Sequence, residues 1–423
     1  LWEVVVLSKI LIAFVFLGFL ALFFSGILVV SEPIKLVPYD LIFPVLGFAV
    51  MLTLLTKQRM YFPMGLRQAI VLGFGLLTWH SLQALISPDV PRAITLLGIV
   101  TRDVCTMVLF AIVVANYRQI MKAINYAFFA AAVLASLIAL PIFVLAISDP
   151  ARIVSEPHPG LIYRAGEGLV PHFQGFTHNP IYFATLSMLS AIVGLSISVG
   201  SGLEQIFIRA GLVVLLVAGL STFQRGALVA LILGLVLMVW IFLLYSKPRR
   251  MLAIIMSRAL LVTLLVVPVL IFVRLPNYEG TLFERIAFRF YKAKWELRYN
   301  RWSQVLLPDV FERPLVGHGL RAAELKLGAL VAENAYLEIL YDQGIIGLVV
   351  WGVLFAYVLV VGIKKVEADA TLVPWVLGWI MVLLSLFYVS MQYDPLTWIV
   401  AGIIIGSSGV SFVRGRGIEG RLG

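Results

Sequence analysis

The chain has 423 residues, of which 61% are hydrophobic and only 13% are charged. A soluble domain is closer to half apolar and one quarter charged, so this composition excludes a soluble protein and predicts a polytopic membrane protein. The formal net charge of +10 would suit a nucleic-acid partner in a soluble chain. In a chain this hydrophobic it indicates cytoplasmic loop anchors and one basic external loop, so we expect no nucleic-acid binding.

Apolar runs of about 17–25 residues predict membrane-spanning helices, and the chain contains about twelve of them. The first run has no cleavage site after it and is interpreted as a span rather than a signal peptide. The runs lie near residues 8–30, 39–56, 66–87, 93–115, 120–147, 180–199, 204–221, 225–246, 251–273, 344–363, 371–390 and 396–413.

Short loops rich in Lys and Arg mark the cytoplasmic side of a membrane protein. With about twelve spans, all such turns fall on one side, and we expect both termini in the cytoplasm. Two longer loops, near residues 148–179 and 274–343, then face outward. The basic residues that set this orientation are Lys57, Arg59, Arg67, Arg118, Lys122, Lys247, Arg249, Arg250, Lys364, Lys365, Arg414 and Arg416.

The predicted organisation therefore has four parts. Residues 1–273 hold the first nine or so spans, residues 274–343 form the large external loop, and residues 344–416 hold the last spans. Residues 417–423 include the protease-site tetrapeptide Ile418-Glu-Gly-Arg421 and are expected to be an expression scar.

In the predicted third and fourth spans, His80 and the pair Arg102-Asp103 are polar. Ionisable residues inside a membrane usually mark function. The alternative for Arg102 and Asp103 is a structural pair whose charges neutralise each other. For His80, a functional and a structural role are likewise both open.

The first outer loop contains His158, His172 and His178, three of the five histidines. Their spacings of 14 and 6 residues (172 − 158 and 178 − 172) match no standard zinc pattern. We therefore expect no metal here, and a loop that contacts sugar or phosphate is the better interpretation.

Arg225 follows an apolar run in Ser221-Thr-Phe-Gln-Arg225-Gly-Ala. An arginine at or inside a span is costly and usually faces a partner or a polar cavity, so Arg225 is a candidate anion ligand at an outer helix end. An arginine that merely snorkels from the helix end to the interface is the alternative.

Residues 281–302 combine aromatic and basic side chains and predict an amphipathic helix at the membrane interface. Arg285 and Arg289 share one face of it because they are four residues apart, and guanidinium groups match phosphate oxygens bidentately. The helix is either an interfacial anchor alone or also part of a diphosphate site. The aromatic members are Phe283, Phe288, Tyr291, Trp295, Tyr299 and Trp302.

Glu333 precedes Asn334 and Tyr336 where the polar loop turns into a helix. A carboxylate beside a membrane and a basic cluster can act as a general base. The alternative is an ordinary acidic residue favoured at a helix start by the helix dipole.

Three segments together resemble the O-antigen polymerase/O-antigen ligase family of bacterial lipid-linked glycan polymerases and ligases. The first is the loop-to-helix entry at 178–184, and the second is the helix-start Ser-x-x-x-Arg-Gly-Ala at 221–227. The third and most specific is Pro-Leu-Val-Gly-His-Gly at 314–319, followed by Glu-Asn-x-Tyr-Leu-x-x-Leu-x-x-x-Gly-Ile-Ile-Gly at 333–347. The resemblance covers about residues 174–361.

The resemblance implies an all-α, GT-C-like membrane protein that acts as a metal-independent glycosyltransferase without a cofactor. Its donor would be a glycan on undecaprenyl diphosphate, and its acceptor a saccharide on a lipid-linked glycan or on lipid A-core. Residues 274–343 would be the catalytic and donor-binding loop, facing the periplasm from the bacterial inner membrane. The implied site consists of Glu333 as the catalytic base, Arg225, Arg285 and Arg289 at the donor diphosphate, and Asn334, Tyr336, His318 and His178 at the acceptor or glycan.

One position departs from the ligase pattern, because ligases of this family carry His-Asn-x-Tyr-Leu where this chain has Glu333. An acidic residue there is more similar to the polymerase branch, so we expect an O-antigen or exopolysaccharide polymerase with membrane lipids and a chain-length regulator as further partners. An O-antigen ligase remains open. A transporter of lipid-linked oligosaccharide is a more distant alternative, since transporters bind substrate at mid-membrane.

Overall fold

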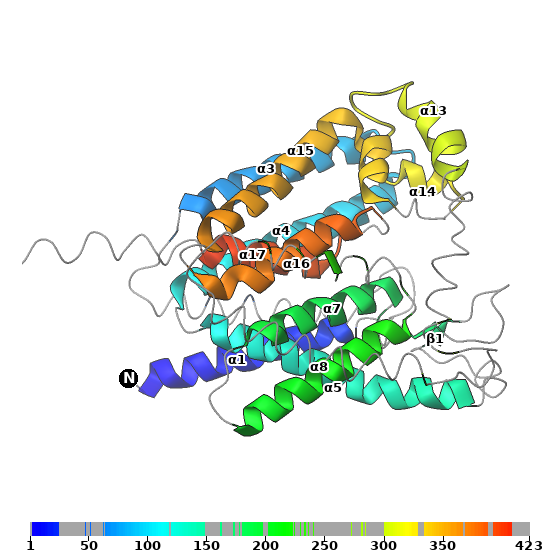
Figure 1. Cartoon of the computed structure of the whole chain (residues 1–423). Helices are drawn as coiled ribbons and strands as arrows, with labels where there is room; N and C mark the ends of the chain where they lie inside the picture. Colours follow the sequence, from blue (N-terminus) through cyan, green and yellow to red (C-terminus); the bar gives the residue numbers. More distant parts are fainter. Residues whose placement is uncertain are drawn as a thin grey trace, which may run out of the picture. The chain divides into compact units, whose positions relative to one another are not determined.

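The structure is a computed structural model of the whole chain (Figure 1). The contacts divide the chain into two compact units, residues 1–58 with 119–293 and residues 59–118 with 294–423. The described residues are 2–24, 47, 51, 62, 64–117, 120–148, 161–162, 172–173, 177, 180–197, 202–222, 224, 229, 232–233, 236, 240, 272, 281, 284, 300–328, 334–366, 369–387 and 392–407.

The regular secondary structure of the described residues is helical apart from one antiparallel pair of two-residue strands, β1 (Leu161–Ile162) and β2 (His172–Phe173). The prediction of an α-helical protein is therefore confirmed for this part of the chain. Four of its helices are long and apolar enough to cross a membrane, as predicted for a membrane protein. They are α4 (Val90–Asn116), α5 (Ile120–Ser148), α8 (Gly202–Ser221) and α15 (Ala335–Val366).

Shorter apolar helices also coincide with predicted runs: α7 (Pro180–Ser196), α16 (Val373–Ser385) and α17 (Pro395–Ser407). The runs near 39–56, 225–246 and 251–273 lie largely outside the described residues. The total of about twelve spans and the GT-C-like architecture accordingly stay predictions.

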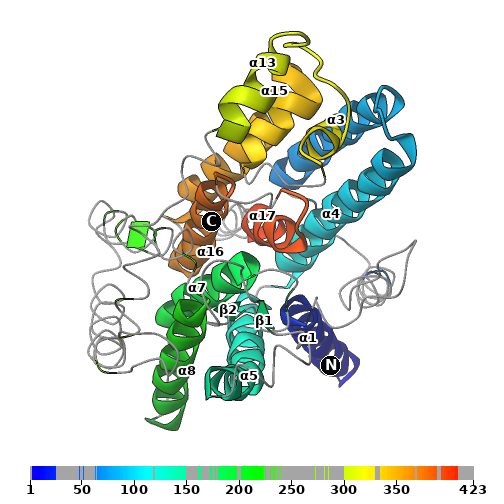
Figure 2. The same cartoon turned by 90° about the vertical axis from the view of Figure 1, so that its right-hand side faces the viewer.

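The first unit contains α1 (Trp2–Phe23), α5, α7 and α8 (Figure 2). Phe129 of α5 fits against two glycines of the neighbouring helices. A Cβ atom would lie 2.3 Å from the Phe129 ring at Gly194 of α7 and 2.7 Å from it at Gly211 of α8. The absence of these side chains therefore lets the three helices approach one another around a single aromatic ring.

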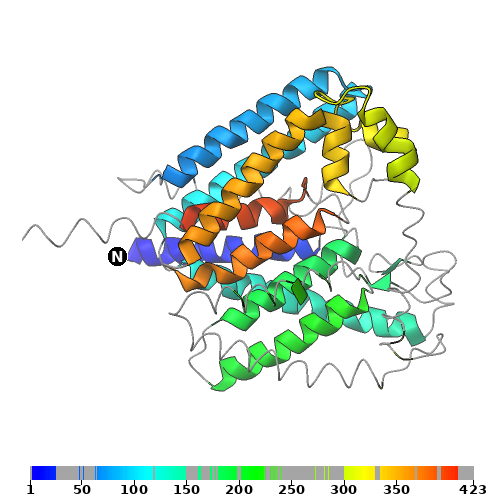
Figure 3. The same ribbon diagram turned by 45° about the horizontal axis from the view of Figure 1, so that its top comes forward.

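The second unit contains α3 (Met64–Leu85), α4, α15, α16 and α17. Close packing of α17 on α4 depends on Gly402 and Gly406, where a Cβ atom would lie 2.5 Å from the carbonyl oxygens of Met107 and Ala111. Small residues four positions apart are typical of helix crossings in membranes. The hairpin of α3 and α4 is thereby joined to the C-terminal helices, and α3 runs beside α15 (Figure 3).

Short helices complete the second unit before and after α15. They are the π-helix η1 (Arg301–Leu306), α13 (Leu307–Val310), α14 (Ala322–Lys326) and the 3-10 helix η2 (Ala370–Leu372).

Within α4, Asp103 is fully buried, and its Oδ1 lies 2.8 Å from an Nη of Arg102. This geometry agrees with the interpretation of the two residues as a mutually neutralised pair.

Candidate active site

The most specific sequence motif forms one structural device, a break in helix α15 that a polar loop fills. At Gly344 the backbone turns to φ 67° and ψ −170°, and the helix bends there (Figure 3). In an unbroken helix the next two N–H groups, of Ile345 and Ile346, would donate to carbonyls four residues earlier. Instead they donate to Pro314 O over 2.8 Å and to Leu315 O over 3.2 Å.

The carbonyl groups left free by the break are satisfied by the same loop. Tyr341 O accepts from the N–H of His318 over 3.0 Å, and Asp342 O accepts from the N–H of Gly319 over 2.8 Å. An unpaired backbone group costs free energy away from water. The 314–319 loop therefore replaces both halves of the hydrogen bonding that α15 loses at Gly344.

The glycines of the motif are required by this backbone-to-backbone contact. Gly317 and Gly319 have positive φ angles of 71° and 94°. A Cβ atom on Gly317 would lie 2.5 Å from Asp342 O, and one on Gly344 would lie 2.3 Å from Leu315 O. Only glycine tolerates both the positive φ angle and the close approach of another backbone. Gly317, Gly319 and Gly344 therefore serve the contact between the loop and the helix rather than flexibility.

Asp342 holds the next segment of the loop. Its side chain is 1% exposed, and its two carboxylate oxygens accept the N–H groups of Arg321 over 2.9 Å and Ala323 over 2.8 Å. Arg321 has a positive φ of 64°, which is costly for a residue with a side chain. The two hydrogen bonds explain how this conformation persists at the start of α14.

Two side chains of the α3 end tie the loop to the helical hairpin. Gln83 donates from Nε2 to Val316 O over 2.8 Å, and Ser87 donates from Oγ to Leu320 O over 2.8 Å. The loop is thus fixed between α3 and α15, which makes it a rigid platform for side chains that face away from it.

His318 is the titratable side chain that the platform orients. Its Nε2 lies 2.9 Å from the carbonyl oxygen of Asp309, and its ring stacks on Tyr341 with centroids 4.7 Å apart. A carbonyl oxygen only accepts, so Nε2 carries the proton in this hydrogen bond and Nδ1 of the neutral ring is an acceptor. His318 is half-buried. Because Nε2 already carries a proton, Nδ1 is the ring atom that can accept one.

A charged pair lies beside this histidine. Asp309 Oδ2 is 2.7 Å from Lys326 Nζ and accepts from the Tyr341 hydroxyl over 3.2 Å. The hydrogen bond from Lys326 holds the pKa of the Asp309 carboxyl below its ordinary value, and the carboxylate in turn raises the pKa of Lys326. Both groups stay charged at neutral pH and form a polar rim next to His318.

Asn334 and Tyr336, predicted to contact glycan, fix the start of α15. Asn334 Oδ1 accepts the N–H of Leu337 over 3.1 Å, which caps the helix. The Tyr336 hydroxyl donates to Leu383 O over 2.9 Å at the end of α16. The side-chain amide NH₂ of Asn334 has no partner among the described residues and can still donate to a ligand.

The remaining predicted site residues lie outside the described residues: Glu333, Arg225, Arg285, Arg289 and His178. Some residues adjacent to them in the sequence are described. Glu333, for example, directly precedes the capping residue Asn334. For the described part of the chain, no group of His, Cys, Asp and Glu side chains could hold a metal ion.

Helix boundaries near these residues agree with the sequence prediction except at Ser221 and at the start of the span predicted at 344. Helix α7 begins at Pro180, as the 178–184 segment predicts. Ser221 was expected at a helix start, but it is the last residue of α8, where its hydroxyl donates back to Val217 O. Helix α15 begins at Ala335 rather than at 344, because the break at Gly344 lies inside it.

The start of the predicted 281–302 helix shows a reciprocal cap. The N–H of Glu284 donates to Thr281 Oγ1 over 3.2 Å, and the N–H of Thr281 donates to Glu284 Oε2 over 2.5 Å. This capping box is typical of a helix N-terminus. Residues 285–299 of the predicted helix lie outside the described residues.

Sequence reasoning missed Asp342, Gln83 and Ser87. Asp342 could have been identified from the sequence, since a carboxylate in an apolar helix needs hydrogen-bond partners. The contribution of Gln83 and Ser87 depends on contacts more than two hundred residues away, which no local pattern shows.

The family model described as O-Antigen ligase matches residues 210–352. The matched range includes part of α8, the 314–319 loop and the break in α15. The match supports the O-antigen polymerase/ligase family, in agreement with the resemblance of the motifs. No curated protein matches the chain.

Proposed function

We propose that this chain of the O-antigen polymerase/ligase family transfers a glycan from undecaprenyl diphosphate to a saccharide acceptor at the outer face of the inner membrane. One observation carries the proposal most directly. The family motif folds into the platform of the 314–319 loop and the α15 break, which presents His318 on one side and leads through the capped start of α15 to Glu333.

The reaction replaces one bond at the anomeric carbon by another. The bond from that carbon to the diphosphate oxygen breaks, and a bond to the acceptor hydroxyl oxygen forms. The leaving diphosphate keeps the electron pair and needs positive charge near it. We assign this role to Arg225 and to Arg285 or Arg289, since guanidinium groups bind phosphate oxygens bidentately.

The acceptor hydroxyl must lose its proton as it attacks, and we assign that proton to Glu333. The residue precedes Asn334, whose side chain caps α15. The partial positive charge of a helix N-terminus favours the ionised carboxylate.

His318 is the second candidate base. Its Nε2 is committed to the Asp309 carbonyl, which leaves Nδ1 as the acceptor. His318 and Glu333 can be separated experimentally because only Glu333 stands at the position where ligases of the family carry a histidine.

We propose a polymerase in particular, because an acidic residue at 333 resembles that branch. A ligase is the second candidate, favoured by the description of the matching family model. Purified protein in liposomes distinguishes them when it is given lipid-linked repeat units with and without lipid A-core. A polymerase forms a ladder of longer lipid-linked glycans from repeat units alone, whereas a ligase forms product only with lipid A-core.

The same experiment tests the enzyme class. Glycosyl transfer releases undecaprenyl diphosphate together with a glycan product. Movement of intact donor across the bilayer without release would indicate a transporter and would contradict the proposal.

A further inference from the structure

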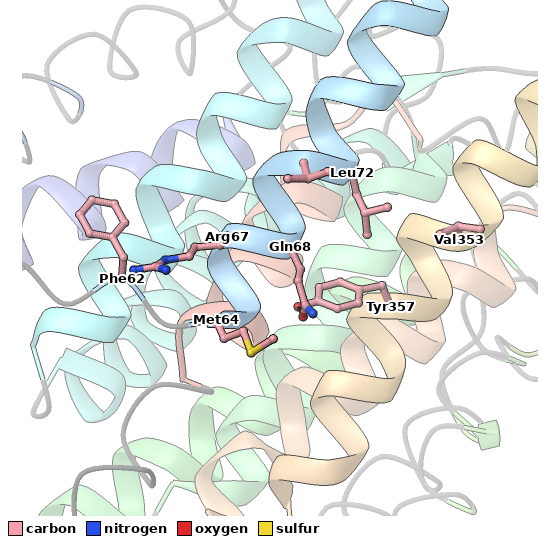
Figure 4. A pocket seen from close by; sticks show the side chains of 8 residues that line it. Phe62, Met64, Arg67, Gln68, Leu72, Val353 and Tyr357 are labelled. Carbon is pink, nitrogen blue, oxygen red and sulfur yellow. Dashed lines mark hydrogen bonds between the residues drawn. The ribbon is translucent and has the colours of Figure 1, made fainter.

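A groove of about 1170 Å³ lies between the first turns of α3 and the part of α15 that holds Val353 and Tyr357 (Figure 4). Its walls are mostly apolar and include Val71, Leu72 and Val353. At one end Arg67 extends beside Phe62 from the first turn of α3. The groove thus has a long hydrocarbon surface and a cation at one end.

Polar contacts keep this end of the two helices together. The Tyr357 hydroxyl of α15 lies 2.8 Å from Gly65 O and 2.9 Å from Gln68 Oε1 of α3. The groove is therefore framed by fixed side chains. It is also remote from the candidate active site, since Gln68 and Gln83 are separated by 15 residues (83 − 68), or about 22 Å along α3.

Two cations near this end have no ion-pair partner among the described residues. Arg67 and Lys364 are both exposed, and neither forms an ion pair with a described residue. Lys364 follows Tyr357 by seven residues, about two helical turns, so it lies beyond the groove on the α15 side. Arg67 and Lys364 also belong to the basic turns that the sequence predicts on the cytoplasmic side.

We propose that this groove binds one anionic phospholipid of the cytoplasmic leaflet. The guanidinium of Arg67 holds the phosphate, and an acyl chain lies over Val71, Leu72 and Val353. Basic pockets between membrane helices on the cytoplasmic side bind acidic head groups. The phospholipid matches the groove because its phosphate can face Arg67 while its acyl chain lies along the apolar wall.

The polyprenyl tail of the donor is the competing occupant. Its diphosphate is assigned above to Arg225 and to Arg285 or Arg289, which the sequence predicts at the outer face, whereas Arg67 belongs to a turn predicted on the cytoplasmic side. A donor diphosphate at Arg67 would therefore lie in the other leaflet. We therefore assign the groove to a phospholipid.

Native mass spectrometry of the purified full chain tests the assignment with added phosphatidylglycerol, phosphatidylethanolamine and undecaprenyl phosphate. Wild type is expected to retain phosphatidylglycerol preferentially. Arg67→Ala should weaken that binding about tenfold, the usual effect of losing a charged hydrogen bond. Val353→Trp should weaken it by filling the groove while every charge remains.

Arg92→Ala is the matched control, because it removes an arginine from the α4 start near the other end of α3, where Arg92 pairs with Asp89 at 3.3 Å. Its phosphatidylglycerol binding should equal that of wild type. Equal binding in wild type, Arg67→Ala and Val353→Trp would overturn the proposal. If equimolar undecaprenyl phosphate displaces phosphatidylglycerol from wild type but not from Arg67→Ala, the groove is assigned to the donor instead.

Discussion

The N–H of Gly319 donates to the carbonyl oxygen of Asp342 over 2.8 Å, which completes a hydrogen bond that helix α15 gives up at its break. Gly319 of the polar loop and Asp342 of helix α15 are thereby joined through their backbones. The loop cannot move away from α15 without leaving buried polar groups unpaired.

Gly344→Ala should destabilise the protein and reduce transfer. The new methyl group would need a φ of 67° and would lie 2.3 Å from Leu315 O. Backbone strain of this kind costs about 1–3 kcal/mol before the clash is counted. The thermal unfolding midpoint in detergent measures the effect.

Gly352→Ala is the control on the same helix. A Cβ atom there meets nothing within 4 Å, so the substitution should be neutral or stabilising by up to about 1 kcal/mol. Equal midpoints for Gly344→Ala and wild type would show that the break is not required.

Asp342→Ala should release the start of α14. The N–H groups of Arg321 and Ala323 would lose their acceptors, at about 1–3 kcal/mol for each buried group left unsatisfied. Hydrogen exchange should then accelerate at residues 319–326 more than in α16. Unchanged exchange at 319–326 would mean that other acceptors hold this segment.

The Asp309–Lys326 pair should stabilise the protein across neutral pH and lose this contribution only at extreme pH. Asp309 has a lowered pKa, so its contribution is present above its ordinary value of 3.8 and is lost as pH falls through the lower folded value. Lys326 has a raised pKa, so its contribution is present below its ordinary value of 10.5 and is lost as pH rises through the higher folded value.

The midpoint difference between wild type and Asp309→Asn should therefore stay constant from about pH 7 to pH 9 and shrink below about pH 4. A difference that changes between about pH 7 and pH 9 would point to another titrating group near Asp309.

Arg225→Ala should weaken donor binding and transfer at least about tenfold, because a charged hydrogen bond contributes roughly 1.5–3 kcal/mol. Arg225→Lys should recover only part of the loss, since an ammonium lacks the planar fork. Arg209→Ala is the control, because Arg209 is an exposed arginine on α8. Full activity in Arg225→Ala would remove this residue from the donor site.

The sequence predicted the helices well because their apolar runs are long and local. Asn334 and Tyr336 were predicted as glycan contacts, and no observation tests that role. The structure shows that Asn334 caps α15 through Leu337, three residues away, and that Tyr336 donates to Leu383 of α16, 47 residues away. The break at Gly344 was interpreted as the end of the loop, since a glycine at a polar boundary gives the same local pattern as a helix start.

Substitution of Glu333 by Gln tests the central claim most directly, with transfer from an undecaprenyl-diphosphate glycan measured in liposomes. Glu333→Gln preserves shape and hydrogen bonding but removes the base, so donor binding should stay normal while turnover falls by about 10²–10⁴-fold. His318→Gln, which can still donate to the Asp309 carbonyl, should lose less than about tenfold. Wild-type turnover in Glu333→Gln, together with a large loss in His318→Gln, would contradict the account and make His318 the base.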